Sequence, residues 1–443
     1  MNRRDFLKFA AMTGLAVAAP ARTARAAFQP YAGPYYVMVS ARGGWDPVYF
    51  CDPKPKGDYN RIYDFDPAVH KVGNIRYAPI PVSAVALGLT VEADPFLMSA
   101  EEFFTAHGGN TLVLNGVNTE TNNHDRGVQT TWSGVGDRPL PSLAALAAAH
   151  KAPNHPLAFI SSGGYSNSGN LLPVSRLSSV AAFQKIASPN LIDVTKPDGP
   201  TYHHPDTAAR IAQTQAERLQ AMAAAEHLPR VKESQNHLYL ARSNMDALST
   251  VMLPTLVTLP ANLGDLQRMM QQTQLAIAAF QAGLAVSANI ELGGFDTHAN
   301  HDRAQVLQLA KLFHGIHFLI EQAKLAGIAN QLVIVVGSDF ARGKGYNGPL
   351  ATDGKDHWPV TSMMVMSGDS GVVGGDRVVG ATTDDTQLPK NVDPDTLDVL
   401  DDDTGVQIKS VHVHKALRGL FGLSGTAVDE KFPILAEDLP IFA

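Results

Sequence analysis

Short apolar runs recur along the chain and alternate with longer amphipathic stretches. Six of these runs predict buried strands, at residues 35–40, 111–114, 156–161, 284–290, 331–336 and 362–366. Residues 206–226, 265–282 and 303–325 have helical spacing instead; in the last segment, the apolar face carries Val306, Leu309, Phe313, Ile316 and Ile320. Strands that alternate with helices predict an α/β fold with an open, mostly parallel central sheet and helices on both faces.

The helical pattern is densest between residues 206 and 253. We interpret this stretch as a helical insertion or cap beside the sheet. The pattern shows no internal repeat and no sharp boundary elsewhere. Residues 28–443 are therefore predicted to form a single domain.

The first 26 residues have the layout of an export signal. Arg3 and Arg4 form a paired-arginine box, an uncharged apolar run of 11 residues follows at 9–19, and small residues at 24 and 26 suit a signal peptidase. A spanning helix needs about 20 apolar residues, so no stable membrane anchor is expected. The sequence predicts a twin-arginine signal peptide at residues 1–26, the twin-arginine translocase as a partner, and a destination in the periplasm or beyond.

Charge and cysteine content narrow the function further. The formal charge of −7 becomes −11 without the signal, which carries five basic residues and one acidic residue. An acidic surface argues against nucleic acid or anionic lipid as the main partner. Cys51 is the sole cysteine, which excludes an intramolecular disulfide.

Acidic and histidine side chains follow the ends of several predicted strands. In parallel α/β sheets these ends share one edge, where ligands bind. Crowded carboxylates raise one another's pKa, and a divalent cation bound by carboxylate and imidazole relieves this. We therefore predict a site for one or two divalent metal ions, without distinguishing Zn²⁺, Ca²⁺, Mg²⁺ and Mn²⁺. Its candidate ligands are Asp46, Asp296, His298, His301, Asp339 and His357.

Each candidate ligand also has a structural interpretation. Asp46 could cap a turn, and Asp296 or Thr297 could cap the helix that starts near Arg303. An isolated histidine such as His357 is often structural. The spacing leaves open which of His298 and His301 would bind a metal.

A polar loop at residues 118–126 follows the second predicted strand and leads into a predicted helix through Gln129 and Trp132. A nucleophile or an anion-binding group at the start of that helix would gain from free N–H groups and the helix dipole. The alternative is that Asn122 or Asn123 only caps the helix.

Five motifs, taken in order, resemble the alkaline phosphatase and sulfatase superfamily, and more closely an uncharacterised family of twin-arginine-exported proteins within it. The motifs are GGWD at 43–46, NNHDRGVQTTWSG at 122–134, GGFDTHANHD at 293–302, VIVVGSDFARG at 333–343 and DHWP at 356–359. The resemblance spans nearly the whole chain after the signal. It implies an alkaline-phosphatase-like domain.

The resemblance also implies a metal arrangement. Asp296, His357 and one of His298 and His301 would bind one metal. Asp46 and Asp339 would help to bind a second metal. Two metals a few Å apart could clamp the attacking and leaving oxygens of an ester hydrolysis.

The resemblance further implies catalytic residues. Arg342 or Arg126 would steady a phosphoryl or sulfuryl oxygen. Asn123 and His124 occupy the stretch where phosphatases of the superfamily have a Ser or Thr nucleophile and sulfatases a modified Cys or Ser, and Thr121 lies near it but not clearly in register. The chain also departs from the phosphatases where Phe340, not a histidine, follows Asp339.

Two functions follow as hypotheses. The first is an exported, metal-dependent hydrolase of phosphate or sulfate esters, acting on a small molecule or an envelope polymer. The second is a non-catalytic binding or assembly protein of the cell envelope on a degenerate hydrolase fold, which the missing nucleophile and Phe340 favour.

Overall fold

The protein falls into two compact units, Met1–Pro30 and Tyr31–Ala443. The computed structural model describes residues 30–82, 97–176, 183–185, 188–194, 196, 198–229, 231–232, 235, 255–369 and 371–442. The predicted signal peptide lies outside the described residues. The fold below is therefore that of the second unit.

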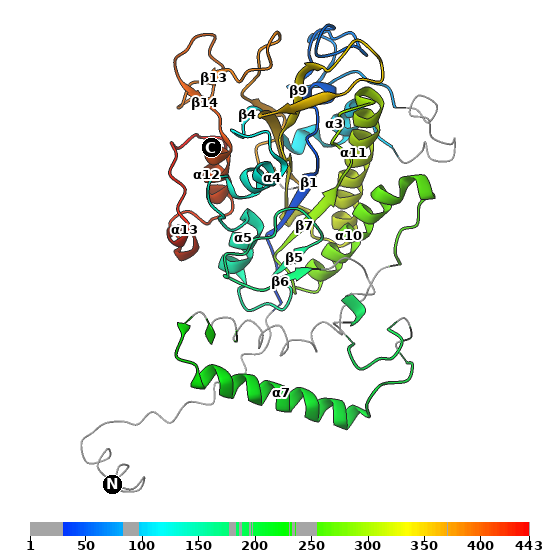
Figure 1. Cartoon of the computed structure of the whole chain (residues 1–443), viewed down its shortest axis with the longest axis vertical. Helices are drawn as coiled ribbons and strands as arrows, with labels where there is room; N and C mark the ends of the chain where they lie inside the picture. Colours follow the sequence, from blue (N-terminus) through cyan, green and yellow to red (C-terminus); the bar gives the residue numbers. More distant parts are fainter. Residues whose placement is uncertain are drawn as a thin grey trace, which may run out of the picture. The chain divides into compact units, whose positions relative to one another are not determined.

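An eight-stranded sheet forms the centre of this unit (Figure 1). All six predicted strands belong to it, and only β11 among its described strands runs opposite to the others. This arrangement confirms the predicted mostly parallel α/β sheet. The spatial order is β12 (Arg377–Val379), β4 (Thr111–Asn118), β11 (Val360–Ser367), β8 (Leu332–Ser338), β1 (Tyr35–Ala41), β7 (Ser287–Leu292), β5 (Phe159–Ser161) and β6 (Val174–Arg176).

Strand β1 is central and pairs in parallel with β7 and β8. All seven of its residues are buried, which explains its nearly continuous apolar sequence. Successive side chains point to opposite faces. Tyr36 stacks on Phe421 with ring centroids 4.1 Å apart, whereas Tyr35 stacks on Phe280 at 4.9 Å.

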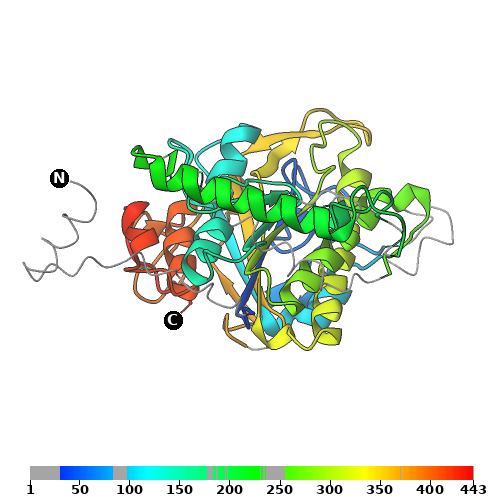
Figure 2. The same cartoon turned by 90° about the horizontal axis from the view of Figure 1, so that it is seen from below.

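Helices cover both faces of the sheet, as predicted. One layer holds α10 (Gly264–Gln281), α11 (His301–Leu325) and α3 (Ala100–His107). The other holds α4 (His124–Ser133), α5 (Leu143–Lys151), α12 (Ser410–Leu420) and α13 (Ala427–Lys431). The view from below shows the yellow-green α10 and α11 and the red α12 and α13 on opposite sides of the blue β1 (Figure 2).

The predicted helix at 206–226 is present as α7 (Pro205–Ala225), in which only Leu219 is buried. Most of the remaining proposed insertion, including residues 236–253, lies outside the described residues. The insertion therefore stays a prediction. No helix in the described part of the chain has both the length and the apolar character needed to cross a membrane.

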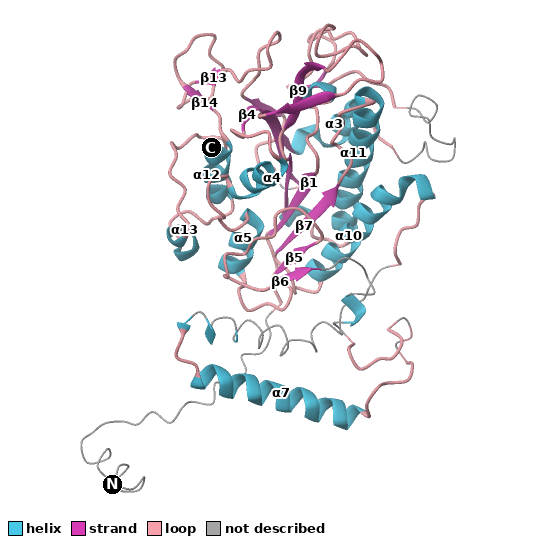
Figure 3. Ribbon diagram, viewed as in Figure 1, coloured by secondary structure: helices cyan, strands magenta, loops and turns pink. Residues whose placement is uncertain are grey.

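The carboxyl edge of the sheet carries short hairpins and loops (Figure 3). Strands β1, β4, β7 and β8 all end at this edge, and the reversed β11 begins there. The antiparallel hairpin of β9 (Ala341–Tyr346) and β10 (Lys355–Trp358) therefore connects the end of β8 to the start of β11. Two-residue ladders elsewhere join β2 (Lys71–Val72) to β3 (Ile75–Arg76), and β13 (Asn391–Val392) to β14 (Val406–Gln407).

His414 fastens α12 to α4 inside the protein. Its Nε2–H donates to the carbonyl oxygen of Thr131 over 2.7 Å. Burial lowers the pKa of His414 to about 4 from its ordinary 6.5. Between these two pH values His414 is protonated in the unfolded chain but not in the folded chain. The free energy of unfolding is therefore unaffected by this histidine above pH 6.5 and decreases as the pH falls toward 4.

We expect His414→Gln to make the free energy of unfolding less dependent on pH in this window. The wild-type protein should lose about 3 kcal/mol more than the variant between pH 6.5 and 4, at about 1.4 kcal/mol per pKa unit. Urea titrations across this pH range measure the difference, with the exposed His203→Gln as control. Parallel curves for wild type and His414→Gln would contradict the assignment.

Candidate functional site

Three histidines converge on Asp296 at the carboxyl edge of the sheet. His298 Nε2 lies 3.1 Å from Asp296 Oδ1 and 3.0 Å from His357 Nε2. His357 Nε2 is 3.4 Å from the same Asp296 oxygen, and His124 Nε2 is 3.5 Å from Asp296 Oδ2. Ligand atoms of His124, Asp296 and His357 all lie within 4.8 Å of one another. We call these four residues the histidine cluster.

The other ring nitrogen of each histidine faces an oxygen acceptor. His357 Nδ1 is 2.7 Å from the carbonyl oxygen of Asn122. His124 Nδ1 is 2.8 Å from Asp339 Oδ2, and His298 Nδ1 is 3.3 Å from Asp356 Oδ1. A carbonyl or carboxylate oxygen only accepts, so we assign the proton to Nδ1 in His124 and His357, whose Nδ1 contacts are the shorter ones. His298 faces a carboxylate through both ring nitrogens, so its contacts fit either tautomer. The Nε2 atoms of neutral His124 and His357 then carry lone pairs.

The assigned tautomers leave the cluster rich in electron pairs. The bare Nε2 atoms of His124 and His357 face the Asp296 carboxylate, and burial lowers the pKa of His357 despite its bond to Asn122, which disfavours an extra proton there. A tetrahedral ion with bonds of about 2.0–2.1 Å keeps its ligand atoms about 3.3 Å apart. The separations of 3.0, 3.1 and 3.4 Å among Asp296, His298 and His357 are close to that value. These three side chains therefore suit a divalent cation.

Arg342 holds Asp296 in place. Its NH2 donates to Asp296 Oδ1 over 2.6 Å and to the carbonyl oxygen of Gly43. Its Nε donates to Gly44 O over 3.0 Å, and its NH1 donates to Lys355 O over 3.2 Å. NH1 also lies 3.5 Å from His298 Nε2, so chain atoms face all five N–H groups. Arg342 is thus an anchor, without a free donor for a substrate oxygen.

The charge of Arg342 also governs the ionisation of Asp296. Burial would raise the pKa of this carboxyl group, but the hydrogen bond and charge of Arg342, with His124 and His298, hold it below its ordinary value. Asp296 is therefore an anion at neutral pH. Its side chain is 50% exposed, so the carboxylate is also accessible to a ligand.

Asp339 supports His124 from below. The carboxyl group is 1% exposed, and its Oδ2 accepts from His124 Nδ1 and, over 3.2 Å, from Gly43 N. Burial raises the pKa of Asp339, and the hydrogen bond and charge of His124 oppose that shift. Its Oδ1 has no hydrogen-bond partner among the described residues.

Phe340 packs beneath two of the cluster histidines. Its buried ring lies 4.8 Å from the His124 ring and 4.3 Å from the His357 ring, measured between centroids. The aromatic ring of Phe340 therefore supports the two imidazoles. Gly44 makes room for it, because a Cβ on Gly44, whose φ is +89°, would lie 2.6 Å from the Phe340 ring.

Asp46 and His301 lie in a different, fully buried group. Asp46 Oδ2 accepts from Lys355 Nζ over 2.7 Å and faces His301 Nε2 at 2.9 Å. Its Oδ1 accepts from Val48 N, so Asp46 also caps the 3₁₀ turn Pro47–Tyr49, which is the structural alternative considered above. Burial would raise the pKa of Asp46, but Lys355 and His301 lower it overall. Of the two histidines left open by the sequence, His298 is the one in the histidine cluster.

The candidate residues in the loop before α4 and at the start of that helix have different positions in the structure. Asn123 caps α4 by accepting from Arg126 N over 3.1 Å, and Thr121 Oγ1 accepts from Asn123 N over 3.2 Å. Neither side chain has a hydrogen bond to the histidine cluster among the described contacts. Arg126 lines a separate cavity of about 270 Å³ with Glu120 and Ser410. His124 is thus the one candidate from this loop that the fold brings to Asp296.

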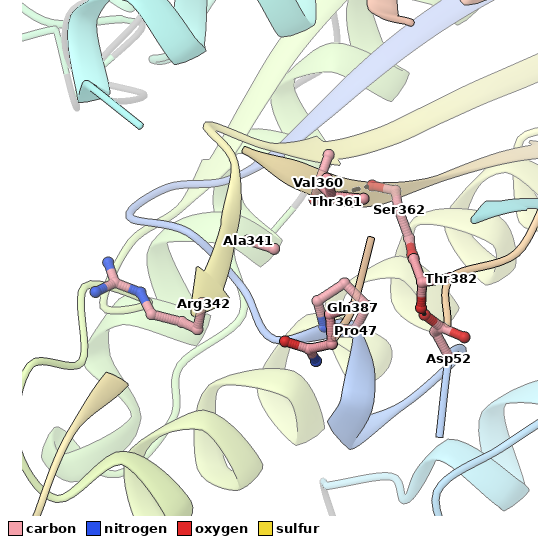
Figure 4. Close-up of a pocket in the computed structure, with 9 residues that line it drawn as sticks. All are labelled: Pro47, Asp52, Ala341, Arg342, Val360, Thr361, Ser362, Thr382 and Gln387. Atoms are coloured by element: carbon pink, nitrogen blue, oxygen red, sulfur yellow. Dashed lines mark hydrogen bonds between the residues drawn. The ribbon is translucent and has the colours of Figure 1, made fainter. Parts of the chain in front are cut away.

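A small cavity lies behind Arg342, beside Pro47, Thr361 and Gln387. The Arg342 side chain extends away from the other lining residues (Figure 4). The cavity has a volume of about 10 Å³, which is room for about one water molecule. This cavity is therefore too small for a substrate.

Two residues of the site were not foreseen from the sequence. Lys355 neutralises Asp46, and Asp356 orients His298. Both lie within two positions of His357, which is the only sequence signal that could have indicated them. Their partners are more than 50 residues away, so spacing alone could not pair them.

Comparison with known proteins supports the family resemblance and the export signal seen in the sequence. Residues 35–397 match the model of a family described as "Protein of unknown function (DUF1501)". The chain belongs to the DUF1501 family. Residues 1–20 of this DUF1501 protein match the twin-arginine translocation pathway signal sequence. The signal implies passage through the twin-arginine translocase, to the periplasm or beyond.

The following solved structures resemble this DUF1501 protein distantly. Ps i-CgsB in complex with k-i-k-neocarrahexaose has a TM-score of 0.37 at 8% identity, covering 93% of this chain and 75% of that one. The alkaline phosphatase from the Antarctic bacterium TAB5 has a TM-score of 0.29 at 10% identity, covering 76% and 91%. No curated protein matches the sequence. Similarity this low does not indicate an activity.

We expect Arg342→Lys to destabilise the DUF1501 protein by about 1–3 kcal/mol. Arg342 donates to four oxygens and a lysine has three donors on one nitrogen, so at least one oxygen would lose its partner, at about 1–3 kcal/mol. Urea unfolding measures the change. Arg138→Lys is the control, because Arg138 is exposed and donates to Pro433 O; an equal loss in both variants would contradict the anchoring role.

Proposed function

We propose that this protein is an exported, metal-dependent hydrolase of phosphate or sulfate esters. The observation that carries the proposal is the convergence of three histidine Nε2 atoms on the Asp296 carboxylate. The separations among Asp296, His298 and His357 are those of ligand atoms around one tetrahedral ion. The motif order shared with the phosphatase and sulfatase superfamily supports the choice of ester.

Asp296, His298 and His357 would hold the metal. Two imidazoles and one carboxylate favour Zn²⁺ or another transition metal over Ca²⁺ and Mg²⁺, which prefer oxygen ligands. The acceptors behind the rings, Asn122 O and Asp356, fix the ring orientations as outer partners do in metal sites. A bound ion of this kind supplies Lewis acidity and lowers the pKa of a water molecule.

His124 is the candidate for proton transfer. Its Nδ1–H is held by the buried Asp339, so Nε2 is the atom that can accept a proton. The ring is 38% exposed and begins α4, where the helix N-terminus favours nearby negative charge. We therefore assign His124 as the general base that activates the attacking water, oriented by Asp339.

The first test is metal binding by the mature protein. After chelation, we expect it to take up about one equivalent of Zn²⁺ or Mn²⁺, measured by elemental analysis and titration calorimetry. Asp296→Asn should lower metal affinity by at least tenfold, because the neutral amide loses the charge attraction to the ion. Glu321→Gln, which changes a half-exposed acid on α11 outside the cluster, is the control. Wild-type protein that binds no divalent metal would refute the proposal.

The second test separates binding from chemistry at His124. We expect His124→Asn to keep metal binding but to lower kcat on phosphomonoester, phosphodiester or sulfate-ester substrates by 10²–10⁴-fold, the usual contribution of acid–base catalysis. Steady-state kinetics of the metal-loaded variant measure this. Loss of metal binding instead would show that His124 is a ligand, as its place in the cluster also allows.

A non-catalytic binding role in the cell envelope is the second candidate. It is favoured by the placement of Thr121, whose hydroxyl bonds to Asn123 N and gives the cluster no covalent nucleophile among the described contacts. Absence of turnover on all three ester classes by metal-loaded wild type would favour this function. Its ligand would then be an envelope polymer retained by the metal-loaded protein.

A further inference from the structure

Three charged or polar side chains form a fully buried group that contacts the segments carrying the histidine cluster. Asp46, His301 and Lys355 are each 0% exposed. One carboxylate oxygen, Asp46 Oδ2, receives both Lys355 Nζ at 2.7 Å and His301 Nε2 at 2.9 Å. We call this group the buried triad. Two rings flank its cation, with Lys355 Nζ 5.1 Å from the Tyr49 centroid and 4.9 Å from that of Tyr346.

Each member of the buried triad comes from a different segment of the site. Asp46 follows β1, His301 begins α11, and Lys355 begins β10. Backbone hydrogen bonds also join the last two segments, from Lys355 N to Thr297 O over 3.3 Å and from His301 N to Asp353 O over 3.2 Å. The triad therefore ties the three loops together at one carboxylate.

His301 connects the triad to the loop that carries Asp296 and His298. His301 Nδ1 lies 2.8 Å from the Thr297 hydroxyl, between those two cluster residues. Gln305 strengthens this link, because it donates to the Thr297 hydroxyl over 2.9 Å and accepts from Asp46 N over 3.1 Å. A shift of Asp46 would therefore move this loop.

Lys355 connects the triad to the hairpin that carries His357. Its carbonyl oxygen accepts from Arg342 NH1 over 3.2 Å, and Arg342 in turn holds Asp296. Lys355 is two residues before His357 on β10, where His357 pairs with Arg342 across the hairpin. The ammonium group thus fixes the strand that presents the His357 ring.

Energetics make a purely stabilising role a poor explanation. Removing two charges from water is expensive, and well-packed apolar residues often replace a buried ion pair with no loss of stability. Directional contacts, in contrast, fix the relative positions of segments. The separations within the cluster are matched to an ion to within a few tenths of an Å, which demands such fixing.

We propose that Asp46, His301 and Lys355 are positioning residues that set the distance between the Asp296–His298 loop and His357, and thereby the metal affinity. The proposal rests on the proposed metal site. The triad does not touch the ion, and it acts through Thr297 and Arg342.

The chain provides a matched control. Lys311 on α11 is 4% exposed, and its Nζ lies 2.9 Å from both carboxylate oxygens of Asp265 on α10. This ion pair joins two helices and has no hydrogen bond to the cluster among the described contacts. Its loss should lower stability without changing the metal site.

The experiment compares Zn²⁺ affinity and thermal midpoint in the full mature protein. We expect Asp46→Asn and the double variant Asp46→Asn/Lys355→Met to bind Zn²⁺ 10–100-fold more weakly, the range typical of residues that support metal ligands. Lys311→Met should lower the midpoint but leave the Zn²⁺ affinity within twofold of wild type. Competition with a chelator of known affinity gives the dissociation constants.

The double variant guards against misfolding, because it leaves no buried charge unpaired. Wild-type Zn²⁺ affinity in either triad variant would overturn the proposal. Unfolding of both triad variants would also overturn it, since the triad would then serve the whole fold. Wild-type protein that binds no Zn²⁺ is a different result, because it removes the proposed metal site itself.

Discussion

The convergence of three imidazole Nε2 atoms on one carboxylate is the constraint around which this site is organised. An oxygen acceptor faces Nδ1 of each ring and fixes the orientation of that ring. Arg342 compensates part of the charge on Asp296, and its donors are then fully used. The three histidines, the acceptors behind their rings and the anchoring arginine therefore form one arrangement around Asp296.

The reversed strand β11 gives the cluster its composition. If β11 ran parallel to its neighbours, its start would lie at the opposite edge of the sheet. Because it is antiparallel to β8 and β4, the chain turns back at once, and His357 reaches the edge where Asp296 and Asp339 lie. The reversal of β11 therefore brings the hairpin with His357 to the edge that also carries the start of α4 with His124 and the loop with Asp296.

The structure divides its acidic residues between two environments. Asp46 is sealed with Lys355 and His301, whereas Asp296 remains half exposed beside Arg342. Asp339 is intermediate between these two, because its carboxylate is buried but is bonded to the partly exposed ring of His124. Burial thus separates the carboxylates that organise loops from the one open to a ligand, although all three follow strands in the same way.

The sequence by itself determined the export signal, the six main strands and the edge that carries the chemistry, because apolar periodicity and strand-end polarity are local properties. The sequence could not show which of the strand-end residues lie together in the histidine cluster. Asp46 and Asp296 look alike in sequence, as do His298 and His301. Only the tertiary structure paired Asp46 with Lys355, 309 positions away, and left His298 facing His357. Such pairings depend on long-range packing and burial, which residue spacing does not encode.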